Sequence, residues 1–536
     1  MVRNRINRTT QGTMWCVCLM LVAGSLTWAT PPAFAEEETA ALSMPPIFGD
    51  GMVLQYGSYA PIWGSATPNK RVRLSIGDFR KSTRADDAGH WQIDVPTTNV
   101  RPGGPHVLQV KSKGDRLIFS DVLFGEVWVC SGQSNMQWAM TQARDPETEI
   151  AAANHPNIRL FYVKRTVSGT PLNDVPVQAA WSACTPESVK GFSAVAYYFG
   201  RRLHTVNPEI PVGLIHTSWG GTPAESWTSM GKMKSIPDLD PILKRWDGIL
   251  ANYPEAKAKY DKQVGTWKVT SDKAKADGKP APRRPRAPMG PDHPHRVSSL
   301  YNAMIHPLLP YGIRGAIWYQ GESNAGRAHQ YRTLFPAMIT DWREQWDRGD
   351  FPFFFVQLAN FRAVDSLPVE SDWAELREAQ SMTLDLPNTG QAVIIDIGEA
   401  NDIHPKNKQD VGARLAQSAF KVAYDMDVAD SGPVYSSMRK DGNAIRVSFD
   451  HVHGGLAVSG TALYGFSIAG EDKQFHWAQA RIDGDEVVVS SADEPNPVAV
   501  RYGWANNPIC NLYNVDGLPT SPFRTDEWPG VTVGKH

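Results

Sequence analysis

Short alternating runs of apolar and polar residues fill the first part of the chain. The runs RVRLSI, HWQIDV and HVLQVKS place an apolar side chain at about every second position, and glycine, proline and polar pairs separate them. A two-residue period is typical of strands that bury one face. We therefore expect a small N-terminal β-sandwich-like domain over residues 43–120.

The pattern changes over residues 121–428, where apolar runs of strand length alternate with stretches of helical spacing. The strand-like runs are EVWVC, PVGLIHTS, RGAIWYQ, FFFVQL and QAVIIDI. The helix-like stretches are AVAYYFGRRLHTV, YRTLFPAMITDWREQW and VGARLAQSAFKVAY. This alternation predicts an α/β fold with a mainly parallel sheet covered by helices.

Two further segments depart from this alternation. Residues 275–290, KADGKPAPRRPRAPMG, are rich in proline and arginine, which predicts a solvated loop within an insertion at about residues 237–294. Over residues 429–536 the alternating runs return, in AIRVSFD, HWAQARI, EVVVSS and AVRYGW. We expect a C-terminal β domain there.

Residues 1–35 have the layout of a secretory signal peptide. Three arginines precede the apolar stretch WCVCLMLVAGSLTWA, and PPAFA follows it. The alternative is a retained membrane anchor, but the apolar stretch is short for a span. We expect cleavage after Ala35, a secreted or periplasmic protein, and no membrane association after cleavage.

Net charge argues against one class of function, and the cysteine count limits the number of disulfides. The chain has 54 basic and 56 acidic residues and a net charge of -2, which excludes the basic footprint of a nucleic-acid-binding protein. After cleavage only Cys130, Cys184 and Cys510 remain, so one disulfide at most can form. Cys130 lies between apolar residues and is expected to be a buried core residue. The oligomeric state is not indicated.

Polar clusters follow four of the predicted strands. SGQSN follows EVWVC, WGGTPAES follows PVGLIHTS, GESNAG follows RGAIWYQ, and GEANDIHP follows QAVIIDI. Because the carboxyl ends of parallel strands meet at one edge of a sheet, these clusters are expected to form one functional site.

Ser134 is the candidate nucleophile within this edge. Gly132 and the polar residues after it end the strand, so Ser134 is expected on a strand-to-helix turn, where free N–H groups favour a developing anion. The alternative is that Ser134 or Asn135 only caps the helix NMQWAMTQA. A serine nucleophile needs a base, and His404 is the best placed. The competing histidines are His216, His293, His295, His306 and His329.

Four sequence blocks carry a resemblance to a known family. GQSNM, HTSWGGTPAESW, IWYQGESN and DIHPKNK resemble, in this order, the blocks of the SGNH-hydrolase superfamily and specifically its sialate O-acetylesterase branch. The resemblance implies a flavodoxin-like α/β/α core and a serine esterase that removes O-acetyl groups from sugars through an acetyl-serine intermediate. It implies an acetylated carbohydrate substrate, no metal and no cofactor.

The resemblance also implies roles for individual residues. Ser134 would be the nucleophile and His404 the general base. The oxyanion hole would be formed by the Ser134 N–H, a glycine N–H of WGGT and a side chain of YQGESN. The glycine expected is Gly221, with Gly220 next to it, and the side chain expected is Gln320, with Asn324 as the alternative.

Further residues around these blocks are expected to bind substrate. They are Gln133, Asn135, Glu225, Trp227 and Glu322. Glu225 and Trp227 follow the glycine turn and are the more plausible sugar contacts, whereas Glu322 has the alternative role of orienting its loop.

The last block departs from the usual pattern of the superfamily. An aspartate normally stands three residues before the histidine, but Asn401 occupies that position and Asp402 stands two before. An asparagine cannot stabilise the imidazolium as a carboxylate does. We predict that Asp402 orients His404, with Glu399 or a backbone carbonyl as alternatives.

Two other functions fit the same residues. An esterase acting on acetylated xylan or another polysaccharide would use the same blocks. A catalytically inactive glycan-binding protein is the alternative from another class, although the presence of both Ser134 and His404 argues against it.

Overall fold

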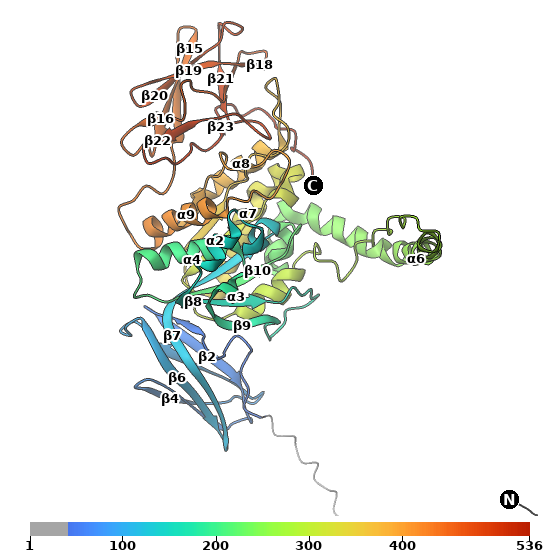
Figure 1. Cartoon of the computed structure of the whole chain (residues 1–536), viewed down its shortest axis with the longest axis vertical. Helices are drawn as coiled ribbons and strands as arrows, with labels where there is room; N and C mark the ends of the chain where they lie inside the picture. Colours follow the sequence, from blue (N-terminus) through green and yellow to red (C-terminus); the bar gives the residue numbers. More distant parts are fainter. Residues whose placement is uncertain (1–40) are drawn as a thin grey trace, which may run out of the picture. The chain divides into compact units, whose positions relative to one another are not determined.

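A single long strand joins the N-terminal strands to the central sheet. The computed structural model describes residues 41–536, so the predicted signal peptide at residues 1–35 lies outside the described residues. Strand β7 (Asp115–Gly132) pairs antiparallel with β6 (Gly103–Ser112) at its start and parallel with β10 (Val212–Ser218) at its end. Figure 1 shows β7 running between these two regions. The boundary predicted between residues 120 and 121 therefore falls inside a strand.

The remaining N-terminal strands form antiparallel pairs, in line with their two-residue period. β2 pairs with β5, and β3 pairs with β4 and β6, while β1 runs parallel to β7. Their bounds are β1 (Val53–Gln55), β2 (Tyr59–Ser65), β3 (Arg71–Ile76), β4 (Phe79–Arg84) and β5 (His90–Pro96).

The central sheet has the order β13-β12-β11-β7-β10-β8-β9. All of its neighbouring strands are parallel except β8 and β9. The other bounds are β8 (His155–Val163), β9 (Val177–Cys184), β11 (Gly315–Tyr319), β12 (Phe353–Val356) and β13 (Thr389–Ala392). The run QAVIIDI is only partly a strand, because β13 ends at Ala392.

Helices cover both faces of this sheet. Successive side chains of β7 point to opposite faces, so Val127 and Val129 pack with α7 (Ala328–Trp346) and α8 (Asp372–Met382). Trp128 and Cys130 pack with α4 (Ala194–Val206) and α9 (Lys408–Ser418) on the other face. The predicted α/β/α core is confirmed.

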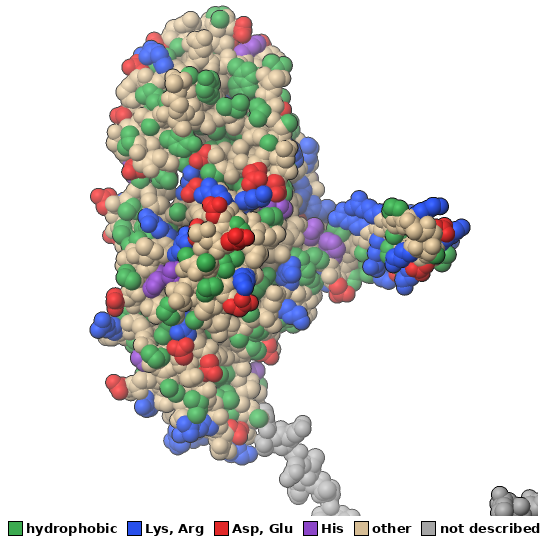
Figure 2. All heavy atoms as spheres, viewed as in Figure 1, with side chains coloured by type: hydrophobic (Ala, Val, Ile, Leu, Met, Phe, Trp, Pro, Cys, Tyr) green, Lys and Arg blue, Asp and Glu red, His purple; other side chains and the backbone are tan. Residues whose placement is uncertain are grey.

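The insertion contains a long helix that the sequence pattern does not predict. α5 (Met230–Ser235) is followed by α6 (Asp240–Ala276), a helix of 37 residues in which only Ile242, Trp246 and Ser271 are buried. Residues 279–290 have no regular structure, as their proline content predicts. Figure 2 shows Lys and Arg side chains gathered along α6.

Antiparallel strands fill the C-terminal region, as predicted. They form sheets in the orders β14-β15-β20-β19, β16-β22 and β18-β17-β21-β23 around a separate apolar core. The bounds are β14 (Val434–Asp441), β15 (Ala444–Asp450), β16 (Leu456–Val458), β17 (Phe466–Ala469), β18 (Phe475–Trp477), β19 (Gln479–Asp483), β20 (Glu486–Ser490), β21 (Ala499–Tyr502), β22 (Leu512–Asn514) and β23 (Phe523–Arg524).

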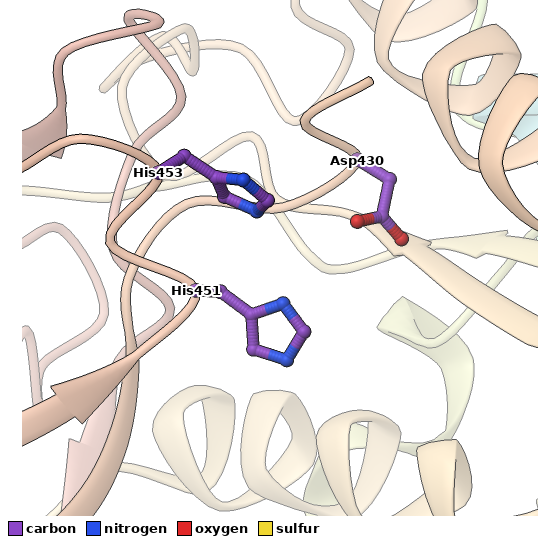
Figure 3. A group of neighbouring side chains, drawn as sticks. All are labelled: Asp430, His451 and His453. Carbon is purple, nitrogen blue, oxygen red and sulfur yellow. The ribbon is translucent and has the colours of Figure 1, made fainter. Parts of the chain in front are cut away.

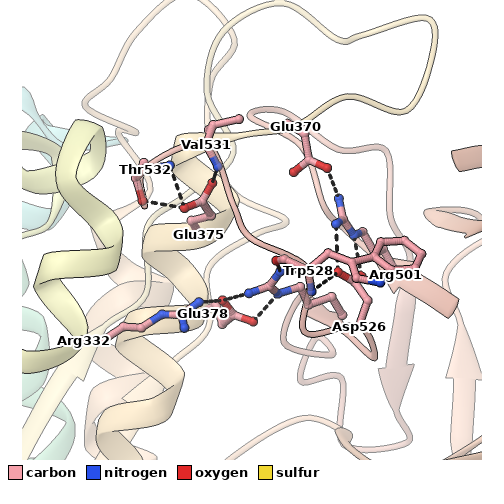
Figure 4. A network of polar contacts seen from close by, with 10 residues as sticks. Arg332, Glu370, Glu375, Glu378, Arg501, Asp526, Trp528, Val531 and Thr532 are labelled. Atoms are coloured by element: carbon pink, nitrogen blue, oxygen red, sulfur yellow. Dashed lines mark hydrogen bonds and ion pairs between the residues drawn. The ribbon is translucent and has the colours of Figure 1, made fainter. Parts of the chain in front are cut away.

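Polar contacts join β23 and the segment after it to helix α8 (Figure 4). Glu375 in α8 is 1% exposed and accepts hydrogen bonds from the backbone N–H groups of Val531 (2.6 Å) and Thr532 (3.2 Å). One turn later, Glu378 pairs with Arg524 at 2.7 Å. The buried carboxylate of α8 therefore depends on the C-terminal segment for its partners.

The three cysteines of residues 41–536 are not joined by disulfides. Cys130, Cys184 and Cys510 are free thiols, and Cys130 is fully buried, as expected of a core residue. Burial raises the pKa of the Cys130 thiol well above its usual value. None of the helices in residues 41–536 combines the length and the apolar character that a membrane span requires.

Candidate active site

The turn after β7 is fixed by close backbone contacts. Gly132 has a φ of +141°, and a Cβ at this position would lie 2.2 Å from the carbonyl oxygen of Tyr319, so only glycine fits. Gln133 then donates its N–H to the same carbonyl at 2.9 Å. Ser134 follows as the first residue of α1 (Ser134–Gln137), which is shorter than the predicted helix because the chain turns at Trp138.

The glycine loop after β10 lies directly against Ser134. A Cβ added to Gly220 would lie 3.2 Å from the Cβ of Ser134. The N–H of Gly220 is already bonded to Gln137 Oε1, at 2.7 Å. Gly221 is exposed, has a φ of +77°, and donates no hydrogen bond from its N–H to any residue in 41–536. Of the two glycines, Gly221 therefore has the free donor.

His404 is held by a carboxylate and an aromatic ring. Its Nδ1 lies 3.3 Å from Asp402 Oδ1, and the same oxygen accepts the His404 backbone N–H at 2.9 Å. The imidazole stacks on Trp138 with ring centroids 4.6 Å apart and planes at 14°. The alternative carboxylate, Glu399, instead accepts the backbone N–H of Lys406 at 2.9 Å. Asp402 is therefore the carboxylate next to the ring.

Asn135 connects the serine turn to the histidine loop. Its Nδ2 donates to the carbonyl of Ile403 at 3.0 Å, so the residue after Ser134 is bonded to the residue before His404. No hydrogen bond joins Ser134 Oγ to His404 in the described part of the chain. The two side chains are thus carried by bonded elements, in the looser arrangement common in unliganded enzymes.

A buried lysine, which the sequence analysis missed, lies beneath these residues. Lys408 is fully buried, and its Nζ donates to Asn135 Oδ1 at 2.5 Å. Asn135 also donates to Glu322 Oε1 at 2.6 Å, so one asparagine joins a cation to an anion. Burial lowers the pKa of Lys408 to about 7. Its position in the first turn of α9, where cations are disfavoured, was a signal in the sequence.

The pKa of His404 is below its ordinary value. Burial is the main cause, the positive charge of Lys408 adds to it, and Asp402 opposes it. A lowered pKa keeps the imidazole neutral, and therefore basic, at neutral pH.

The two candidate side chains for the oxyanion hole differ in their free donors. Gln320 Nε2 donates to Asn324 Oδ1 at 2.7 Å and to the carbonyl of Thr222 at 3.3 Å, so both of its hydrogens are engaged. Asn324 Nδ2 makes only one hydrogen bond within residues 41–536, to Glu225 at 3.0 Å. The structure therefore favours Asn324 over the expected Gln320.

Most of the predicted substrate-binding side chains are buried and bonded to neighbouring residues of the chain. Glu225 and Trp227 are 0% exposed and Asn135 is 1% exposed, so these side chains are buried in the free protein, and their contact with substrate stays a prediction. Gln133 is 3% exposed, and its Oε1 accepts backbone N–H groups of the loop after β11. Glu322 is bonded to Asn135, which agrees with the alternative role of orienting its loop.

Only one group in residues 41–536 has the composition and spacing to hold a metal ion, and it lies in the C-terminal region. Asp430, His451 and His453 place one ligand atom each within 4.8 Å of one another. Figure 3 shows the three side chains facing a common space. None of them belongs to the elements that carry Ser134 or His404.

Comparison with known proteins gives a consistent picture. The family model described as carbohydrate esterase, sialic acid-specific acetylesterase matches residues 125–258 and 292–421. The sialate O-acetylesterase of Mus musculus is 30% identical over 88% of this chain and 92% of that protein. The human sialate O-acetylesterase is 29% identical over 88% of this chain and 90% of that protein.

A solved structure agrees with these sequence relatives. A carbohydrate acetylesterase from Xanthomonas citri is 39% identical and superposes with a TM-score of 0.77, covering 91% of this chain and all of that one (100%). The chain therefore belongs to the sialic acid-specific acetylesterase family of carbohydrate esterases and is a carboxylic-ester hydrolase.

Proposed function

We propose that this chain is a secreted or periplasmic serine esterase that removes O-acetyl groups from acetylated sugars, with acetylated sialic acid as the first candidate substrate. The observation that carries the proposal is the approach of Asp402 Oδ1 to His404 Nδ1, at 3.3 Å, in a loop bonded to the helix that Ser134 begins. A carboxylate on one ring nitrogen leaves the other free to accept a proton. The names of the relatives, sialate O-acetylesterase, support the choice of sugar.

The proposed reaction has two steps. His404 takes the proton of Ser134 as Oγ attacks the acetyl carbonyl, and the tetrahedral intermediate collapses to acetyl-serine while His404 returns the proton to the sugar oxygen. Water then attacks the acetyl-serine, His404 takes a proton from the water, and acetate leaves as Ser134 regains its proton. Asp402 holds the imidazole tautomer throughout.

Three donors are proposed to stabilise the oxygen of the attacked carbonyl. The N–H of Ser134 is the first of α1 and has no partner within the helix. The N–H of Gly221 and the second hydrogen of Asn324 Nδ2 would complete the set. Donors fixed before the reaction stabilise the negative charge without reorganisation of solvent.

Hydrolysis of p-nitrophenyl acetate by the wild type and Ser134→Ala tests the catalytic part. We expect Ser134→Ala to lose about 10³-fold or more in kcat. Ser437→Ala, at an exposed serine of β14, serves as the control. Rapid quenching followed by mass spectrometry should find one acetyl group on the peptide that contains Ser134. Undiminished turnover by Ser134→Ala would contradict the mechanism.

Acetate release from acetylated sialic acid and from acetylated xylan tests the substrate part. Release from xylan alone would make the choice of sialic acid wrong and leave the serine mechanism standing. Binding of either glycan without any release by the wild type would support the inactive glycan-binding alternative.

The proposal of export rests on the pattern of residues 1–35. Expression of the full chain in a secreting host and sequencing of the mature N-terminus should find Glu36 as the first residue. A protein retained in cells with residues 1–35 intact would contradict it.

A further inference from the structure

Two arginines share one buried carboxylate next to the proposed oxyanion donors. Arg245, in α6, lies 2.8 Å from Glu225 Oε1, and Arg327 donates to the same oxygen at 2.7 Å. The second oxygen, Glu225 Oε2, accepts a hydrogen bond from Asn324 Nδ2 at 3.0 Å. One carboxylate therefore connects both guanidinium groups to the side chain favoured for the oxyanion hole.

The positive charge of this cluster lies on its accessible side. The side chain of Glu225 is 0% exposed, whereas that of Arg327 is 16% exposed and that of Arg245 is 32% exposed. Because an arginine does not lose its proton in proteins, two guanidinium groups against one carboxylate leave one net positive charge. Arg245 makes no other hydrogen bond among the described residues, so most of its five N–H donors are available.

The surrounding groups add no second negative charge. His295 lies close to Glu225 and is bonded to the carbonyl of Gly221, and His293 lies beside His295 with ring centroids 4.6 Å apart. Burial lowers the pKa of both, that of His293 to about 4, so both are neutral at neutral pH. Arg286 is the other charged group acting on them. Among the described groups that act on Arg245 and Glu225, the buried Glu225 is therefore the one anion.

We propose that Arg245 and Arg327 form a subsite for a carboxylate of the substrate, so that the esterase prefers an acidic acetylated sugar to a neutral one. The inference rests on the proposed esterase function and specifies its substrate class. The planar guanidinium fork matches a carboxylate with two parallel hydrogen bonds. Sialic acids carry a carboxylate that is ionised at neutral pH, whereas acetylated xylose units carry none.

The test compares two substrates that differ in one charge. Acetate release is measured for 9-O-acetyl-N-acetylneuraminic acid and for its methyl ester, with the full-length mature enzyme. The wild type should favour the acid by about tenfold or more in kcat/KM, and Arg245→Met should bring this ratio close to one. Because the ratio is taken within each variant, a general loss of activity or folding does not alter it.

Lys244→Met is the matched control, since Lys244 is exposed on the same helix and the change removes the same charge. It should keep the wild-type ratio. An unchanged ratio in Arg245→Met, or a wild type that treats acid and ester alike, would overturn the subsite. The esterase proposal stands after either result if the wild type hydrolyses p-nitrophenyl acetate and Ser134→Ala does not. Retained hydrolysis in Ser134→Ala would instead overturn that proposal.

Discussion

The two halves of the candidate active site are held by different parts of the structure. Ser134 follows a central strand, and backbone contacts to Tyr319 fix the turn before it. His404 lies in a loop, its side chain is 24% exposed, and the side chains of Asp402 and Trp138 hold its ring. The sheet thus positions the nucleophile, whereas two side chains position the base. Substitutions near the base should therefore alter catalysis with little effect on folding.

The largest effect is expected from the carboxylate on the base. Asp402→Asn should lower kcat by about 10³- to 10⁴-fold, because an amide does not hold the required tautomer or stabilise the imidazolium. Glu399→Gln should stay close to wild type, since Glu399 bonds a backbone N–H instead, and Asn401→Ala should show at most a modest loss. Steady-state kinetics with circular dichroism checks this. A large loss of kcat in Glu399→Gln together with a near-wild-type kcat in Asp402→Asn would assign the role to Glu399.

The next largest effect is expected from removing the side-chain donor of the oxyanion hole. Asn324→Ala should lower kcat by about 10²- to 10³-fold with a smaller change in KM, the usual result of removing an oxyanion donor. Gln320→Ala should lower the melting temperature, because Gln320 is fully buried and both of its amide hydrogens are bonded. If Gln320→Ala shows the larger kcat loss at an unchanged melting temperature, Gln320 is the donor.

A smaller effect is expected from the ring under the base. Trp138→Leu removes the stack on His404, and aromatic pairs contribute roughly 0.5–1.5 kcal/mol, so kcat should fall about two- to tenfold. Thermal unfolding of the same variant should change little, since Trp138 is only partly buried. An increase in KM with unchanged kcat would instead indicate that Trp138 contacts the sugar.

The smallest effect is a shift in pH dependence. Burial and Lys408 lower the pKa of His404, so the acid limb of kcat/KM should lie below pH ~6.5 in the wild type. Lys408→Met removes a positive charge, which should raise the pKa of His404 and move the acid limb to higher pH. Lys406→Met, at an exposed lysine of the same loop, should leave the limb in place. An unmoved limb in a folded Lys408→Met would exclude this electrostatic role.

Hydrophobic periodicity was sufficient to predict the layers of the core and the edge that carries the site. β7, β10 and β11 end at Gly132, Ser218 and Tyr319, where the polar clusters begin. The run after Ala392 shows a limit, because Ile394 and Ile395 are buried without belonging to a strand. An apolar run predicts burial more reliably than backbone pairing.

Helix α6 and the burial of Glu225 could not be predicted, for two different reasons. A largely exposed helix has little apolar periodicity, and α6 buries only three of its 37 residues. Glu225 was predicted to bind substrate because it follows the glycine turn, but it is fully buried, which a carboxylate seldom is unless paired. Its partners, Arg245 and Arg327, are 20 and 102 residues away, so sequence neighbours gave no indication of the pairing.

The bonds between Glu375 and the C-terminal segment have a consequence for the order of events during synthesis. Val531 and Thr532 are made 156 and 157 residues after Glu375, so α8 leaves the ribosome with a carboxylate whose final partners do not yet exist. The same helix carries Gln380, which donates to the carbonyl of Gln320 beside the active site at 3.0 Å. The nascent chain should therefore acquire esterase activity only after the C-terminal β region has been translated.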